Sequence, residues 1–201
     1  SFKQSDSFSL SEDDVYMTYR GCNPGTTLWK NLRNRIESYS IIGRVKLNGE
    51  NINEFGDTQF AAMRNVKMIV ALLTTDFMDF LRLDLQGKVN YNLLEWLMAL
   101  TCFAFAGSQT IIFPILLFSD SDVFNLDMIP EVSPQTTIDE CSRILNNHGL
   151  CSPWSLDTLT ARDIVKKLIE RERYCRWDCP VNTALEDDIC NKLEELSLLR
   201  R

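Results

Sequence analysis

Glu95 is the residue of this 201-residue chain whose surroundings most clearly suggest chemistry. It is the only charged side chain in the apolar stretch 92–106, and Tyr91 stands four residues before it. Such a carboxylate could hydrogen-bond ribose hydroxyls and stabilise an oxocarbenium-like transition state during N-glycosidic cleavage, and Tyr91 could stack on a ring. Helix capping explains the same carboxylate equally well, because with Asn92 as N-cap Glu95 stands at the third helical position.

Other familiar catalytic and cofactor-binding arrangements find little support. His148 is the only histidine, which argues against a Ser-His-Asp triad, a Cys-His dyad and a multi-histidine metal site, and we expect it on the surface or in a loop. Cys175 and Cys179, with Cys151 and His148, lack the paired spacing of a zinc site. The chain has no GxGxxG and no GxxxxGK[ST] motif. We therefore predict no metal and no bound cofactor.

Composition and charge indicate which binding partners and which cellular compartment to expect. The formal net charge of -7 argues against binding to nucleic acid or to an anionic membrane surface. Seven scattered cysteines with no secretory segment before them favour free thiols and a cytoplasmic location. The apolar stretch 93–118 carries Glu95 and a polar break at 107–110, so we do not expect it to span a membrane.

The order of apolar segments predicts an α/β fold. Strands are expected at 15–19, 41–47, 68–73 and 111–118, with a minor strand at 141–145, and helices at 26–36, 60–66, 92–106, 160–171 and 185–196. Thr160 and Asp163 have the spacing of a capping box. This alternation is typical of a flavodoxin-like, doubly wound parallel sheet of about five strands with helices on both faces. We expect a flexible tail at 1–12, a domain at 13–173 and a C-terminal helical extension at 174–201.

In a sheet of this kind ligands bind at the carboxyl ends of the strands. The loops at 20–27, 48–57 and 74–91 should therefore share one rim. Glu95 would stand at that rim, because its helix follows the third of these loops.

Four segments, in the same order along the chain, resemble TIR (Toll/interleukin-1 receptor/resistance) domains. The segment 14–21, DVYMTYRG, resembles the opening box of the family, and 68–74 resembles its third strand. The segment 91–95, YNLLE, matches the W-x-x-x-E arrangement that carries the catalytic glutamate of NAD-cleaving TIR domains, and 111–115 resembles the hydrophobic VIPI strand. The resemblance covers about residues 13–171.

Some features distinguish this chain within the family it resembles. Tyr91 replaces the usual tryptophan, the segment from Gly56 to Val66 is shortened, and 30–31 reads Lys-Asn where plant immune TIR domains have the Ser-His pair of a self-association surface. The long 74–91 segment and Trp154 are more similar to the TIR domain of the animal axon-degeneration NAD hydrolase than to plant receptors. Tyrosine keeps an aromatic face for stacking.

The resemblance implies an NAD glycohydrolase that acts in immune or cell-death signalling. NAD would be the substrate rather than a bound cofactor, and the products would be nicotinamide and ADP-ribose or its cyclic form. Glu95 would be the catalytic carboxylate, Tyr91 would stack on the substrate, and Tyr19, Arg20 and Gly21 would form the nearby wall. The 48–57 loop would gate the site or dock on a second protomer.

Three alternatives stay open at this point. Arg20 is also consistent with a structural residue at a strand end. The chain could be a non-enzymatic TIR module that signals by homotypic assembly with other TIR domains, although adaptor-type members often lack the glutamate. A receiver domain would need a phosphorylatable aspartate at a strand end, for which the Thr74-Thr75-Asp76 sequence after 68–73 is a poor match.

Overall fold

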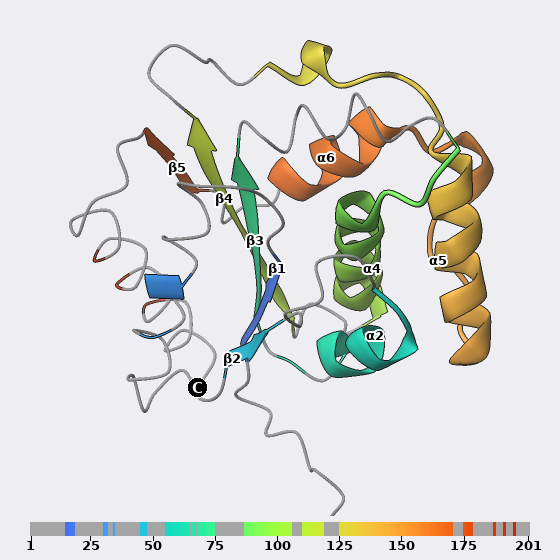
Figure 1. Ribbon diagram of the computed structural model, residues 1–201, viewed down its shortest axis with the longest axis horizontal. Helices are drawn as coiled ribbons and strands as arrows, with labels where there is room; N and C mark the ends of the chain where they lie inside the picture. The colour runs from blue at the N-terminus through green and yellow to red at the C-terminus, as the bar shows by residue number, and fades with distance from the viewer. Residues whose placement is uncertain are drawn as a thin grey trace, which may run out of the picture.

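Figure 1 shows the computed structural model of the chain. It describes residues 15–18, 30–31, 34, 45–47, 55–64, 66, 68–74, 87–105, 110–118, 125–170 and 175–178, and the single positions 187, 191 and 195. The tail predicted at 1–12 lies outside these residues, as do most of the helices predicted at 26–36 and 185–196. The described positions inside those two predicted helices are all helical.

The described strands form one parallel sheet. Its members are β1 (Val15–Thr18), β2 (Val45–Leu47), β3 (Met68–Thr74), β4 (Ile111–Phe118) and β5 (Cys175–Asp178). They pair in the order β2-β1-β3-β4-β5, and each pairing is parallel. The predicted α/β class and parallel sheet are therefore confirmed. The chain reverses its direction of winding between β1 and β3, which makes the carboxyl ends of these two strands the switch point of the sheet.

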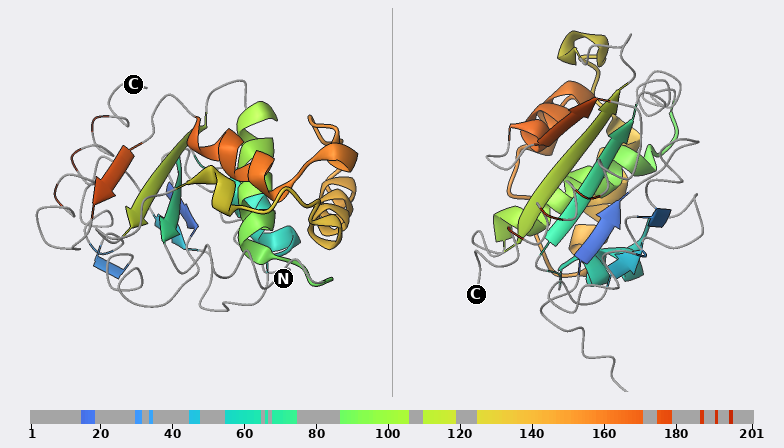
Figure 2. Two further views of the ribbon diagram at one scale, coloured as in Figure 1. Left: turned by 90° about the horizontal axis from the view of Figure 1, so that it is seen from above. Right: turned by 90° about the vertical axis from the view of Figure 1, so that its left-hand side faces the viewer.

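The described α-helices lie on one side of this sheet (Figures 1 and 2). They are α2 (Asp57–Arg64), α4 (Tyr91–Phe105), α5 (Gln135–Asn147) and α6 (Ala161–Ile169), with short 3-10 turns η1 (Leu126–Met128) and η2 (Leu156–Thr158). Helix α4 lies between the sheet and α5, and it runs back from the carboxyl ends of β3 and β4 (Figure 1). Its first turn is therefore at the end of the sheet where ligands bind.

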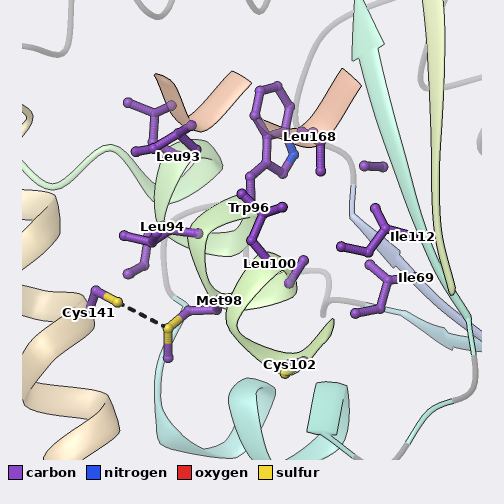
Figure 3. Close-up of a cluster of buried hydrophobic side chains, with 14 of the residues drawn as sticks. Ile69, Leu93, Leu94, Trp96, Met98, Leu100, Cys102, Ile112, Cys141 and Leu168 are labelled. Atoms are coloured by element: carbon purple, nitrogen blue, oxygen red, sulfur yellow. Dashed lines mark hydrogen bonds between the residues drawn. The ribbon is translucent and has the colours of Figure 1, made fainter. Parts of the chain in front are cut away.

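Helix α4 carries apolar side chains all around its circumference because protein surrounds it. Every residue from 92 to 102 is buried, and the helix contacts β1, β4, α2, α5 and α6. Figure 3 shows Leu94 and Met98 directed toward α5, where the Cys141 thiol lies 3.4 Å from the Met98 sulfur, while Leu100 faces Ile69 and Ile112 of the sheet. A helix packed on all sides needs no polar stripe.

The structure differs from the prediction in two places. Residues 141–145 form no strand, because they belong to α5, where Ile138, Cys141, Ile144 and Leu145 are buried at helical spacing. Part of the C-terminal extension expected to be helical from 174 is instead β5, which pairs with β4 beyond the boundary placed at 173. Its sequence, CRWD, lacks a clear apolar pattern, so its strand structure depends on the partner edge of β4.

The start of α6 follows the prediction closely. Thr160 is the N-cap, its Oγ1 accepts a hydrogen bond from the Asp163 backbone N–H at 3.1 Å, and Asp163 Oδ2 accepts one from the Thr160 backbone N–H at 3.0 Å. The capping box is confirmed. Within the described part of the chain, no helix is long and apolar enough to cross a membrane.

Candidate functional site

The first turn of α4 is capped by Asn90. Its Oδ1 accepts hydrogen bonds from the backbone N–H groups of Asn92 and Leu93, both at 3.1 Å, and its carbonyl accepts from Leu94 N at 2.9 Å. Its own backbone N–H donates to Thr137 Oγ1 of α5 at 2.8 Å. The prediction that Asn92 caps this helix is therefore wrong, because the bond to Thr137 fixes Asn90, two residues earlier, in the cap position.

This cap changes the interpretation of Glu95. With α4 beginning at Tyr91, Glu95 is the fifth helical residue, and the first turn of α4 contains no acidic side chain. A carboxylate at the third position can reach back to the cap amide, but one at the fifth cannot take part in a capping box. The capping explanation of Glu95 is therefore wrong.

Glu95 is only 1% exposed, in a helix whose other buried side chains are mostly apolar. Burying a carboxylate costs free energy that burying an apolar side chain does not, unless hydrogen bonds or a charged partner offset it. Neither an amphipathic face nor the helix cap calls for an acid at this position. A buried carboxylate near the end of a parallel sheet where ligands typically bind is a candidate functional group.

Tyr91 and Glu95 lie on one face of α4. They are four residues apart in the same helix, a spacing that stacks side chains one turn above another. Tyr91 is partly buried and packs against the edge of the core. The structure thus brings together two of the predicted site residues, with the aromatic ring nearer the start of the helix.

The remaining predicted site residues, Tyr19, Arg20 and Gly21, lie outside the described residues. They directly follow Thr18, the last residue of β1. Thr18 is joined to α4 by a hydrogen bond from the Trp96 indole Nε1 to its Oγ1 at 3.2 Å. The residue after Glu95 therefore contacts the residue before Tyr19.

Of the loops expected to share the rim, most of each lies outside the described residues. The end of the 48–57 loop is described and anchored. Phe55 is buried in the core, and Gly56 donates its backbone N–H to Gln59 Oε1 at 3.0 Å and accepts from Phe60 N at 3.0 Å. The loop therefore enters α2 at a fixed point.

His148 lies at the other end of the helical layer, as the C-cap of α5. Its ring meets Phe60 of α2 edge-on, with 5.0 Å between centroids, and its Nε2 is 3.6 Å from Asp57 Oδ1. Hydrogen bonds from Asn147 and then Arg143 hold the pKa of Asp57 below its ordinary value. This cluster joins α2 to α5, so the only histidine has a structural explanation in the packing of these two helices.

The described cysteines offer little nucleophilic chemistry. Cys102, Cys141 and Cys151 carry free thiols, and burial raises the pKa of Cys102 and of Cys141 to about 12. A buried thiol of that kind stays protonated and inert at neutral pH. Among the residues that the structure describes, no group of three or more His, Cys, Asp or Glu side chains is placed to hold a metal ion.

Searches for similar proteins leave the site to be interpreted from its own geometry. No protein-family model and no curated protein sequence matches this chain.

Proposed function

We propose that this chain is a TIR-type NAD glycohydrolase with Glu95 as its catalytic carboxylate. One observation carries the proposal: a 1%-exposed acid stands in the second turn of a mostly apolar helix, and the helix cap does not account for it. Its position toward the carboxyl ends of the strands, with Tyr91 one turn before it, is consistent with a site for a nucleotide.

In the proposed reaction the bond between the ribose C1′ and the nicotinamide nitrogen breaks. Nicotinamide leaves with the bonding electron pair and becomes neutral, while positive charge develops on C1′ and the ring oxygen. The negative charge of Glu95 and its hydrogen bonds to ribose hydroxyls stabilise that charge in a site with little water. Water then adds to C1′ and releases a proton, which gives ADP-ribose, whereas attack by the adenine ring gives the cyclic product.

The remaining parts of the site and fold belong to the same proposal. Tyr91 stacks on the substrate, and Tyr19, Arg20 and Gly21 form the wall next to it. The strand order β2-β1-β3-β4-β5 supports a flavodoxin-like, doubly wound sheet with helices on both faces and a ligand site at the switch point. NAD is the substrate, no resident cofactor is needed, and other TIR domains are the expected partners in a cytoplasmic immune or cell-death pathway.

The test is nicotinamide release from NAD by the purified chain over a range of protein concentrations, since self-association could be required. We expect Glu95→Gln to lower the rate by about 100-fold or more, as loss of one transition-state contact commonly does. Glu170→Gln is the matched control, because Glu170 is exposed and its Oε1 forms a surface ion pair with Lys166 Nζ at 3.8 Å.

Two results would contradict the proposal. Equal release by the wild type and Glu95→Gln would remove Glu95 from the reaction. A wild type without NAD cleavage at any concentration would favour the alternative, a signalling module that works by TIR–TIR assembly alone.

A further inference from the structure

The side chain next to Glu95 makes a polar contact across the core. Trp96 Nε1 donates to Thr18 Oγ1 at 3.2 Å, and the two residues are 2% and 1% exposed although 78 positions separate them. Both side chains are buried away from water. The bond therefore satisfies the indole N–H and the threonine hydroxyl, and a buried polar group without a partner would cost free energy. This bond is directional, whereas apolar side chains such as Leu100, Ile69 and Ile112 pack between α4 and the sheet without a hydrogen-bonding direction.

A directional contact at Trp96 fixes how α4 is rotated about its axis. Residues 92 to 102 are all buried and mostly apolar, and this bond adds a directional contact to their packing. Successive helical residues point about 100° apart, so a fixed direction for Trp96 also fixes the direction of Glu95. In Figure 3 the indole lies on the side of α4 near Leu168 of α6.

The acceptor of this bond, Thr18, lies at the carboxyl end of β1. Thr18 is the last residue of β1, and the chain continues directly into Tyr19, Arg20 and Gly21. The bond therefore joins the helix that carries Glu95 to the carboxyl end of β1. The carboxyl end of β1 is also one side of the switch point of the sheet.

We infer that Thr18 and Trp96 are positioning residues, which hold Glu95 in a fixed position relative to the carboxyl end of β1. The inference rests on the proposed NAD-cleaving function. A displacement of about 1 Å at a reacting group can lower a rate by about 100-fold, so even a small rotation of α4 would be visible in the turnover.

The experiment measures kcat and KM for nicotinamide release, with the melting temperature of each variant. Thr18→Val keeps the shape of the side chain and removes the acceptor, and we expect kcat to fall about tenfold with KM nearly unchanged. Thr18→Ser keeps the hydroxyl and should restore kcat to within about twofold of the wild type. Trp96→Phe removes the donor, and the double variant with Thr18→Val should be no slower than the slower single variant, because both act through one bond.

Thr101→Val is the matched control. Thr101 is fully buried on the same helix and also uses its hydroxyl for a hydrogen bond, to the Leu97 carbonyl at 2.8 Å, but it makes no such link to β1. We expect its kcat to stay within about twofold of the wild type even if the melting temperature falls.

The possible failures can be told apart. If the wild type cleaves NAD and Glu95→Gln does not, while Thr18→Val keeps its kcat, only the positioning inference is overturned. The same holds if Thr101→Val lowers kcat as much as Thr18→Val, because the loss would then reflect a weakened helix. A wild type that does not cleave NAD overturns the proposed function and this inference together.

Discussion

Helices α4 and α6 each have one acidic side chain near their start, and the two acids have opposite explanations. Asp163 is the third residue of α6 and exchanges hydrogen bonds with its N-cap, Thr160. Glu95 is the fifth residue of α4, whose cap is Asn90. The distance from the cap decides whether the start of a helix accounts for a carboxylate. It accounts for Asp163 and does not account for Glu95, for which we propose a catalytic role.

The two acids also differ in how deeply they are buried. Helix α6 buries one face and leaves the other partly exposed, and the hydrogen bond from the Thr160 side chain holds the pKa of Asp163 below its ordinary value. Helix α4 is buried on every side, and Glu95 is 1% exposed. The Asp163 carboxylate stabilises the start of its helix through these hydrogen bonds, whereas the Glu95 carboxylate is buried away from the cap of its helix.

Changing the length of each acidic side chain by one methylene should distinguish a catalytic acid from a structural one most strongly. We expect Glu95→Asp to lower NAD cleavage by about 100-fold, because the carboxylate is withdrawn by roughly 1 Å or more from the ribose. Asp163→Glu in α6 should leave cleavage within about twofold of the wild type. The measurement is the rate of nicotinamide release for each variant, together with its melting temperature. A Glu95→Asp variant of full activity would contradict the catalytic role of Glu95.

Removing the cap of α4 should reduce stability directly. Asn90→Ala loses the acceptor of two backbone N–H groups, and we expect the free energy of unfolding to fall by about 1 kcal/mol in denaturant titrations. Asn90→Ser is the control, because serine keeps a capping oxygen and removes Asn90 Nδ2, which is buried without a hydrogen-bond partner in the described structure. Equal stability of Asn90→Ala and the wild type would place the cap elsewhere.

The corresponding change in α6 should be smaller and should not affect catalysis. Asp163→Ala removes the charged member of the capping box, and we expect a loss of about 0.5 kcal/mol in the free energy of unfolding. Nicotinamide release by this variant, measured well below its melting temperature, should equal that of the wild type. A large fall in turnover would show that α6 contributes to the site.

The smallest expected effect is the acid dependence of stability. The pKa of Asp163 and of Asp57 is lowered in the folded state, so their ionised forms stabilise the fold at pH values above the unfolded pKa of about 4. This stabilisation is lost as the pH falls through the lowered folded-state pKa. Melting temperatures between pH 6 and pH 2.5 should therefore fall less steeply for Asp163→Ala than for the wild type, and equal slopes would contradict the assignment.

Sequence patterns predicted the parts of the fold whose signals are local. The unbroken apolar runs of β3 and β4 and the capping box of α6 could be recognised from neighbouring residues alone. The first half of α5 was missed because Pro134 precedes it and its start has no side-chain cap, which left only the apolar run near Cys141 to interpret. The strand β5 takes its structure from β4, a contact that its own residues do not signal.

In the candidate site, too, the sequence signalled the local features and not the contacts between distant residues. Glu95 and Tyr91 could be identified from their spacing within one helix. The cap could not be assigned correctly, because Asn90 and Asn92 are equally good capping residues and the choice depends on Thr137, 47 positions away. The bond between Thr18 and Trp96 depends on how β1 and α4 meet in three dimensions, and the sequence contains no signal for it.

The most direct test compares the two acids in one assay. Nicotinamide released from NAD is quantified for the wild type, Glu95→Gln and Asp163→Asn at equal concentrations of folded protein. We expect Glu95→Gln to be slower by about 100-fold or more and Asp163→Asn to stay within about twofold of the wild type. Equal rates for the two variants, or no release by the wild type, would contradict the assignment of Glu95 as the catalytic carboxylate.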